Sequence, residues 1–331
     1  MKNILVTGSS GGIGSILVNK LLHLGYQVTG IDINEPGIEQ ENPNFVFLQG
    51  SICNDKFLQS IKWRSFENIV HLAATSSLPE CEFNPLRAFE DNLIGTLKLV
   101  EQLKKHGSQG IIFASTSAIY ENNFNYPFDE EMPVSPHLIY SQTKFYSEKF
   151  LESTYRSYGI PYITLRFFNV IGPYQNYKRQ SPPLVNYIIR ELLHNRQPIL
   201  HSDGTQKRDY ISVHDVCQAI ILSLDIIQSS PGVYNICSQE LYNVRNLFQI
   251  IADNMESSLK PIYRESNKLW KEYSEQEEYS FPLKLEIVEN ETNKLSLGTF
   301  EKFNKVTGWK PQTTIVDAIK EIVDISKDLM R

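Results

Sequence analysis

The chain has 331 residues, a formal net charge of −6 and a hydrophobic share of 41%, which indicates one large domain or two packed ones with an ample core. It contains no block of Lys or Arg, so the sequence predicts no binding to nucleic acid or to an anionic membrane surface. No apolar run reaches membrane-spanning length, and the first apolar strand starts too early for us to expect a signal peptide. Four widely spaced cysteines with no metal-binding or disulfide spacing predict a cytoplasmic protein.

Short apolar runs alternate with amphipathic stretches through the first half of the chain. The predicted strands are Asn3–Thr7, Gln27–Asp32, Phe45–Gln49, Asn68–Ala73, Gly110–Ser115 and Tyr162–Phe168. Helices are predicted from Gly12 to Leu24 and from about Pro136 to Tyr158, each followed by a glycine. This alternation is typical of parallel strands joined by crossover helices, and it predicts an α/β fold with a Rossmann-type doubly wound parallel sheet.

A glycine-rich run, Thr7-Gly8-Ser9-Ser10-Gly11-Gly12-Ile13-Gly14, connects the first predicted strand to the first predicted helix. Glycines permit a tight turn and close backbone approach, and the helix N-terminus offers free N–H groups to a pyrophosphate. Asp32 ends the second strand, where a carboxylate accepts hydrogen bonds from the adenosine ribose and repels a ribose phosphate. We therefore predict an NAD site. Its expected contacts in the glycine run are Gly8, Gly11, Gly12, Ile13 and Gly14.

Tyr140 and Lys144 stand four residues apart in Tyr-Ser-Gln-Thr-Lys, within the long predicted helix. This spacing puts both side chains on one face of a helix. A free phenol titrates near pH 10, and a fixed ammonium beside it, together with the positive charge of an oxidised nicotinamide, favours the ionised form. The pair therefore predicts a base that assists hydride transfer from a carbinol.

The pattern after Gly172-Pro173 is irregular, and the stretch from about Arg264 to Asn293 is charged and weakly periodic. We expect residues 1–172 to form the NAD-binding domain, with segments near 208–237 returning to it. Residues 173–331 are then expected to form mainly a smaller, partly interleaved α/β substrate domain.

Six further motifs follow one another along the chain. They are His71-Leu-Ala-Ala74, Asn92-Leu-Ile-Gly95-Thr96, Ala114-Ser-Thr-Ser-Ala-Ile-Tyr120, Leu165-Arg-Phe-Phe-Asn-Val-Ile-Gly-Pro173, Arg208-Asp-Tyr-Ile-Ser-Val-His-Asp215 and Thr307-Gly-Trp-Lys-Pro311. With them, the chain resembles the extended short-chain dehydrogenase/reductase superfamily, specifically its NAD-dependent nucleotide-sugar epimerases and dehydratases. The glycine spacing alone fits both the classical and the extended branch, and the later motifs favour the extended one.

The resemblance implies catalytic roles for three residues. Tyr140 becomes the general base, and Lys144 lowers the pKa of Tyr140 and holds the nicotinamide ribose. Thr116 is expected to bind the substrate oxygen as it becomes a ketone, with Ser115 and Ser117 as alternatives.

The resemblance also implies binding contacts. Ala73 and Asn92 are expected beside NAD, and Ser51 and Ile52 follow the third strand near the adenine. Ser51 stands where many relatives have an acid, which puts one adenine contact in question. Asn169 and Arg208 are expected to meet the substrate diphosphate, for which a guanidinium is well suited.

Other interpretations of these positions stay open. Arg208 could pair instead with Asp209 or Asp215. Glu121 stands where relatives have a glycine, which bears on the loop above the sugar. Thr299 stands where they have an Asp, and no Arg-x-Gly-Asp segment precedes it, so the nucleotide base is not specified.

The residues after Thr116 narrow the reaction type. Dehydratases of the family carry an Asp-Glu pair there to eliminate water, whereas this chain has Ser117-Ala118. The favoured function is a UDP-hexose 4-epimerase. The alternatives are another nucleotide-sugar oxidoreductase, such as a UDP-glucuronate decarboxylase, a 4-keto-sugar reductase or a dehydratase, and, in another class, a non-catalytic dinucleotide-binding regulator.

A homodimer is expected from the same resemblance. Relatives associate through the helices that correspond to Asn92–Lys105 and Tyr140–Tyr155. The first of these carries an apolar stripe, Leu93, Leu97, Val100 and Leu103. The alternative is that this stripe packs on its own sheet.

Overall fold

The computed structural model describes residues 2–36, 42–107, 110–175, 182–268, 270 and 283–329. Its main sheet is parallel and has seven strands in the order β10-β6-β5-β4-β1-β2-β3. The strands are β1 (Asn3–Thr7), β2 (Gln27–Asp32), β3 (Phe45–Gln49), β4 (Asn68–His71), β5 (Ile111–Thr116), β6 (Tyr162–Phe167) and β10 (Gly232–Ile236). This order is that of a doubly wound Rossmann sheet with one added strand, which confirms the predicted fold class.

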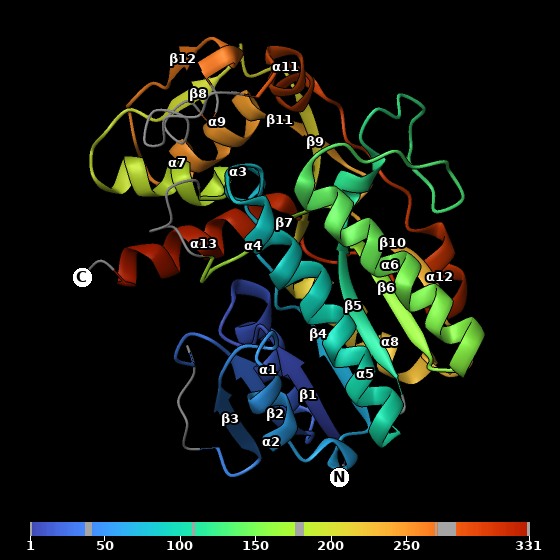
Figure 1. Ribbon diagram of the computed structural model, residues 1–331. Helices are drawn as coiled ribbons and strands as arrows, with labels where there is room; N and C mark the ends of the chain where they lie inside the picture. The colour runs from blue at the N-terminus through green and yellow to red at the C-terminus, as the bar shows by residue number, and fades with distance from the viewer. Residues whose placement is uncertain are drawn as a thin grey trace.

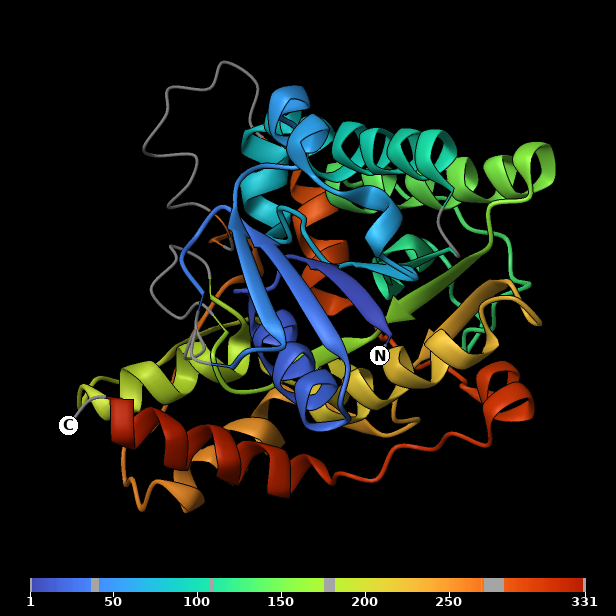
Figure 2. The same cartoon turned by 90° about the horizontal axis from the view of Figure 1, so that it is seen from below.

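Helices cover both faces of the main sheet (Figures 1 and 2). One face carries α1 (Gly12–His23) and α8 (Val213–Ile226), and the other carries α5 (Gly95–His106) and α6 (Ile139–Tyr158). The residues of β1 alternate between two cores: Ile4 and Val6 pack with α1 and α8, whereas Leu5 packs with α5. A strand that is buried on both faces has to be apolar throughout, and this is why the strands read as short continuous apolar runs.

The smaller lobe sits at the carboxyl ends of these strands and has its own apolar core. Its strands are β7 (Asn169–Ile171), β8 (Ile199–His201), β9 (Lys207–Ser212), β11 (Leu241–Asn243) and β12 (Ile262–Arg264), arranged as a β11-β9-β7 sheet and a β12-β8 pair. Its helices are α7 (Leu184–Leu193), α9 (Val244–Asn254), α11 (Leu285–Asn293) and α13 (Ile315–Leu329).

The remaining elements are short. They are α2 (Asp55–Ser60), α3 (Leu78–Phe83), α4 (Pro85–Phe89), α12 (Glu301–Thr307), the π-helical turn η2 (Glu90–Ile94) and the 3₁₀ turns η1 (Trp63–Ser65), η3 (Ser117–Tyr120) and η4 (Ser266–Lys268). None of the helices in the described ranges combines the length and the apolar character that crossing a bilayer requires.

The chain passes between the lobes more than once. After β9 in the smaller sheet, α8 and β10 return to the main sheet, where β10 pairs with β6. Later still, α12 packs against β10. The division at residues 172 and 173 stays a prediction, and the returning segment that reaches the main sheet begins with α8, since β9 belongs to the smaller sheet.

The predicted elements of the first half are confirmed, with small shifts at their ends. The predicted fourth strand ends at His71, because the next residue, Leu72, turns over β1 with its N–H 3.1 Å from the Thr7 carbonyl. The helix predicted from about Pro136 begins at Ile139, and Leu138 before it is extended. The helix expected from Asn92 opens with η2 and becomes α-helical at Gly95.

Candidate active site

A cavity of about 2040 Å³ lies between the main sheet and the smaller lobe. Its floor is formed by residues at the carboxyl ends of the parallel strands, and its other side by β7, β9 and the segments around α11. Ligands of doubly wound sheets bind at this edge. Most of the predicted site residues line the cavity: Gly8, Gly11, Gly12, Ile13, Gly14, Asp32, Ser51, Ile52, Ala73, Thr116, Tyr140, Lys144, Asn169 and Arg208.

The glycine run forms the turn between β1 and α1. Gly8 has φ +72, and a Cβ atom there would lie 2.7 Å from the Ala73 nitrogen. A Cβ at Gly14 would lie 2.0 Å from the Gly8 carbonyl oxygen, so neither position accepts a side chain. Gly11 at the N-cap of α1 makes no side-chain capping bond, so the first N–H groups of the helix remain for a ligand. This geometry suits a pyrophosphate.

Asp32 lines the cavity at the end of β2. Its Oδ2 accepts a hydrogen bond from the Ser10 N–H at 3.0 Å, and its Oδ1 accepts one from the Asn34 N–H at 2.9 Å. These bonds fix the carboxylate while leaving lone pairs for the two hydroxyls of a ribose. Ser51 and Ile52 line the same end of the cavity. The residues present therefore fit the adenosine half of NAD.

Asn92, which was predicted to contact the cofactor, does not line the cavity and instead supports the loop after β4. Its side chain is buried, accepts from the Thr75 N–H at 2.8 Å and donates to the Thr75 carbonyl at 3.0 Å. A third bond joins it to the Thr143 hydroxyl at 3.1 Å. Asn92 therefore holds the loop after β4, and Thr75 and Ala73 form the cavity wall.

A buried histidine, which the sequence did not single out beyond its motif, completes this wall. Thr7 Oγ1 and Thr96 Oγ1 lie 2.7 Å and 2.9 Å from the two ring nitrogens of His71. Burial, together with the nearby charge of Lys144, lowers the pKa of His71 to about 3, so the ring is neutral. His71 is thereby a structural link between β1, β4 and the helix after η2.

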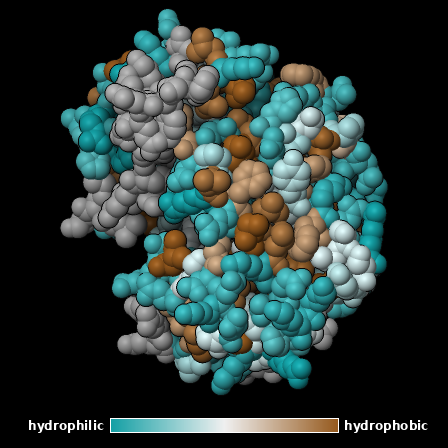
Figure 3. Space-filling view, in the orientation of Figure 1, coloured by the Kyte–Doolittle hydropathy of each residue, from teal (hydrophilic) through white to brown (hydrophobic). Residues whose placement is uncertain are grey.

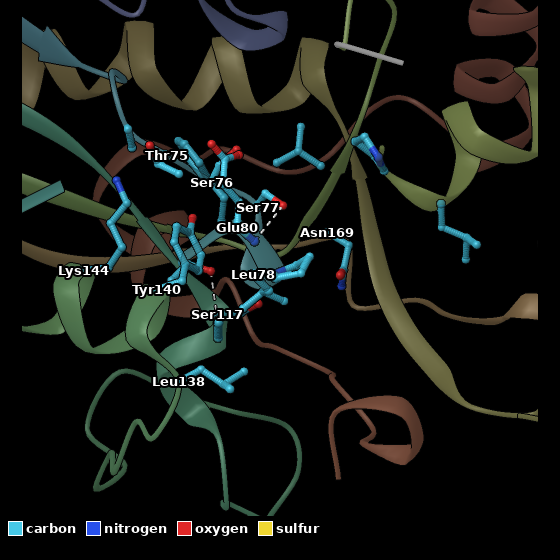
Figure 4. Close-up of a pocket in the computed structure, with 18 of the residues that line it drawn as sticks. Thr75, Ser76, Ser77, Leu78, Glu80, Ser117, Leu138, Tyr140, Lys144 and Asn169 are labelled. Atoms are coloured by element: carbon cyan, nitrogen blue, oxygen red, sulfur yellow. Dashed lines mark hydrogen bonds between the residues drawn. The ribbon is translucent and has the colours of Figure 1, made fainter. Parts of the chain in front are cut away.

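Tyr140 and Lys144 project from the first two turns of α6 into the cavity, side by side (Figure 4). Lys144 is 2% exposed and donates to the Ala114 carbonyl oxygen at 2.8 Å. Burial lowers the pKa of Lys144 to about 8. The ammonium is therefore still charged at neutral pH, and two of its three N–H donors remain for the phenol and a ribose.

Thr116 is the last residue of β5, and its Oγ1 accepts a hydrogen bond from the Ala118 N–H at 3.1 Å. The hydroxyl hydrogen of Thr116 is then available to a ligand in the cavity. Ser115 donates its hydroxyl to Glu148 instead and is 4% exposed. Ser117 lies beside Tyr140 and lines the cavity (Figure 4). Of the three candidate hydroxyls, Ser115 is therefore committed to the protein interior.

Asn169 on β7 and Arg208 on β9 line the cavity from the smaller lobe. Asn169 donates to the Asp209 carbonyl at 2.7 Å, and Arg208 donates to the Glu291 carbonyl at 2.6 Å. The acids that could have neutralised Arg208 have other partners. Asp209 accepts from the Ser238, Gln239 and Gly298 N–H groups, and Asp215 accepts from those of Gln312 and Thr313.

A buried charge network lies next to Tyr140 and Lys144. Arg166 on β6 forms an ion pair with Glu148 on α6 at 2.8 Å and donates to the Tyr120 hydroxyl, also at 2.8 Å. Tyr120 donates in turn to Asn235 Oδ1 on β10 at 2.8 Å. Because Glu148 also accepts from Ser115, the network joins α6, β5, β6 and β10 directly beneath Thr116 and Lys144.

Comparison with known proteins agrees with this geometry. The sequence model of the GDP-mannose 4,6 dehydratase family matches residues 5–322. The chain belongs to this family. It is therefore a member of the extended short-chain dehydrogenase/reductases, which include the NAD-dependent nucleotide-sugar epimerases and dehydratases, as the sequence motifs predicted.

Individual members of the family are similar over most of the chain. The UDP-glucose 4-epimerase of Halalkalibacterium halodurans is 30% identical over 75% of this chain and 78% of its own length. The crystal structure of the Thermotoga maritima UDP-glucose 4-epimerase with UDP-glucose is 29% identical, covers 99% of this chain and 100% of its own, and has a TM-score of 0.86. The dTDP-glucose 4,6-dehydratase of Bacillus anthracis in complex with NAD is 25% identical, covers 99% and 97%, and has a TM-score of 0.81.

Proposed function

We propose that this family member is an NAD-dependent nucleotide-sugar 4-epimerase of the UDP-hexose type. One observation carries the proposal: Thr116, Tyr140 and Lys144 reach the cavity that also contains the glycine turn and Asp32. Its similarity to the 4-epimerases of Halalkalibacterium and Thermotoga supports the same reaction. NAD, when bound, supplies the hydride acceptor and donor that such a reaction needs.

The chain's own residues supply the proton chemistry. Tyr140 as phenolate takes the proton of the sugar C4 hydroxyl, and the adjacent Lys144 charge stabilises that phenolate. Thr116 donates a hydrogen bond to the same oxygen while it becomes a carbonyl. Return of the proton from Tyr140 after the 4-keto sugar has rotated completes an inversion at C4. No further acid or base is required.

Basic side chains at the other end of the cavity are suited to the diphosphate. They come from the smaller lobe and are Arg208, Arg264, Lys268 and Lys294. Arg208 presents a guanidinium that is already held by the Glu291 carbonyl, so little side-chain entropy is lost when it binds. We propose that Asn169 and Arg208 bind the diphosphate and thereby direct the sugar toward Tyr140.

This pose can be tested with UDP alone. We expect Arg208→Ala to weaken UDP binding by about 1.5–3 kcal/mol, the range for a hydrogen bond to a charged group. Arg245→Ala is the matched control, because Arg245 lies in the same lobe and bonds to the Asp203 carbonyl at 2.6 Å. Isothermal titration of NAD-loaded protein measures both, and equal affinities for the two variants would contradict the pose.

Dehydration is disfavoured at this site. Ser117 and Ala118 follow Thr116 and line the cavity, so neither of these positions carries an acid that could promote loss of water from C5 and C6. A decarboxylase or a 4-keto-sugar reductase would use the same three catalytic residues. Purified protein should therefore be incubated with UDP-, dTDP- and GDP-sugars without added reductant, and the products assigned by NMR at C4. A mixture of C4 epimers is the expected result, and a decarboxylated or 4-keto product would overturn it.

The alternative that the protein is a non-catalytic regulator with the same fold can be tested with the variant Tyr140→Phe. We expect turnover to fall by roughly 10²–10⁴-fold, the usual contribution of a general base, while NAD binding persists. The matched control is Tyr146→Phe, because Tyr146 also lies on α6 but is 47% exposed and does not line the cavity. A regulator would show no turnover in either form.

We propose that the enzyme is a cytoplasmic homodimer. The four cysteines are free, as expected in a reducing compartment. Apolar side chains gather on the face formed by α4, α5 and α6 (Figure 3), and exposed ones there include Leu86, Ile94, Tyr146 and Tyr155. In the predicted stripe, Val100 and Leu103 are instead buried against the sheet. Light scattering after chromatography tests the dimer, which Tyr146→Glu should disrupt.

A further inference from the structure

The helix that carries Tyr140 and Lys144 begins without a capping side chain of its own. Leu138 occupies the N-cap of α6 and makes no side-chain capping bond. Instead, the N–H group of its first residue and those of the two residues before it bind two acids from other parts of the chain. Glu121 Oε2 accepts from His137 at 2.7 Å and from Leu138 at 3.0 Å, and Glu82 Oε1 accepts from Ile139 at 2.5 Å. We call Glu82 and Glu121 the carboxylate clamp.

Both acids of the clamp are fixed by their own segments. Glu82 belongs to α3, which packs against α6. Ser77 is the N-cap of α3, and its hydroxyl accepts from the Glu80 N–H (Figure 4). Glu121 directly follows η3, and its N–H is bonded to the Ala118 carbonyl at 3.1 Å. The next residue, Asn122, donates to the Ser135 carbonyl at 3.3 Å. The clamp therefore transmits the position of β5 and α3 to the first turn of α6.

The clamp acts on the turn that contains Tyr140. Ile139, whose N–H binds Glu82, is the residue before Tyr140, whereas Lys144 is anchored separately by the Ala114 carbonyl at 2.8 Å. Displacing a reacting group by about 1 Å can cost about 10²-fold in rate. We propose that Glu121 and Glu82 are positioning residues that hold the Tyr140 phenol against the substrate oxygen; this rests on the proposed function, in which Tyr140 is the base.

Direct contact of Glu121 with the substrate does not explain its placement. The side chain borders the cavity, but its Oε1 atom is buried and has no hydrogen-bond partner in the described part of the chain. Its other oxygen is occupied by two N–H groups of the segment that leads into α6.

The proposal is tested first by hydrogen exchange of the NAD-loaded protein. The variants are Glu121→Ala, which removes the acceptor, and Glu121→Gln, which keeps one. Glu131→Ala is the control, because Glu131 lies in the same connection between β5 and α6 but is 86% exposed at its side chain and pairs with Lys302. We expect faster exchange over residues 137–142 in Glu121→Ala only. Exchange equal to that of the Glu131→Ala protein would overturn the clamp.

Kinetics then separate positioning from general stability. For Glu121→Ala we expect kcat to fall at least about tenfold, with KM and the NAD dissociation constant within about threefold of their original values. Glu121→Gln should restore kcat to within about threefold. An unchanged kcat in Glu121→Ala, or a parallel loss of NAD binding, would overturn the positioning role. If the unaltered protein epimerises no sugar, the proposed function fails, while the exchange experiment still decides the clamp.

Discussion

The start and the middle of α6 are held in opposite ways. At the middle, Glu148 meets the opposite charge of Arg166, and both side chains are at most 5% exposed. At the start, the two acids of the clamp accept from three successive N–H groups, those of residues 137–139, and the charge of Glu121 disfavours the ionised form of Glu82. The paired region joins opposite charges, whereas the like-charged region next to Tyr140 carries a cost in stability that depends on pH.

The pKa of Glu82 shows how the stability of the like-charged region depends on pH. The pKa of Glu82 is raised to about 7, mainly by burial; the hydrogen bond from the Ile139 N–H lowers it and the negative charge of Glu121 raises it. A raised pKa means that the folded protein binds the proton more tightly than the unfolded chain does. The stabilisation from that proton is complete below the unfolded pKa near 4.5 and is lost as the pH rises through 7.

The largest expected effect comes from breaking the paired region. Arg166→Ala leaves Glu148 buried without its counter-charge, and we expect it to lower the free energy of unfolding by about 3–5 kcal/mol. Urea unfolding at pH 7 measures the change. A loss below about 1 kcal/mol would mean that water or another donor reaches Glu148 and that the middle of α6 is not held by the pair.

A smaller effect of opposite sign is expected from the like-charged region. Glu82→Gln removes the titrating carboxyl, so we expect the variant to be more stable than the original protein at pH 8 by about 1–2 kcal/mol after allowance for solvent screening. At pH 4.5 the two proteins should be nearly equal. Unfolding measured across this range tests the sign, and a variant that is less stable at pH 8 would contradict the assignment of a raised pKa.

The smallest effect is expected on the exposed face of the same helix. Arg156 and Glu152 form an i,i+4 ion pair at 2.5 Å, with the Arg156 side chain 74% exposed. We expect Arg156→Ala to cost only about 0.3–0.5 kcal/mol, and less in high salt. Urea unfolding at two ionic strengths gives this baseline, against which the two buried contacts are judged. A loss as large as that of Arg166→Ala would mean that the exposed ion pair stabilises the protein as much as the buried one.

The sequence best predicted those elements whose conformation depends on residues that are close together along the chain. The parallel strands were readable because β1 and β5 are apolar on both faces, and the glycine turn because Gly8 and Gly14 admit no side chain. The start of α6 was placed three residues early, because the N–H groups of residues 137–139 bind Glu121 and Glu82 rather than a local cap. Sequence spacing contains no signal for such a contact.

In the candidate site and in the smaller lobe, too, the sequence did not reveal contacts between residues that are far apart along the chain. The four-residue spacing was enough to place Tyr140 and Lys144 at the cavity. Asn92 could not be distinguished from a ligand contact, since its partner, Thr75, becomes its neighbour only after folding. In the smaller lobe β7, β8, β11 and β12 have three residues each, which is too short for an alternating pattern to be recognised.

The late return of β10 to the main sheet has a consequence for synthesis of the chain on the ribosome. Until residues 213–236 have emerged, β6 is an open edge, and the apolar face that α8 covers is exposed. An unpaired edge beside an apolar surface is prone to aggregate. The nascent protein therefore cannot finish its nucleotide-binding half before the first part of the smaller lobe, from β7 to β9, has been made.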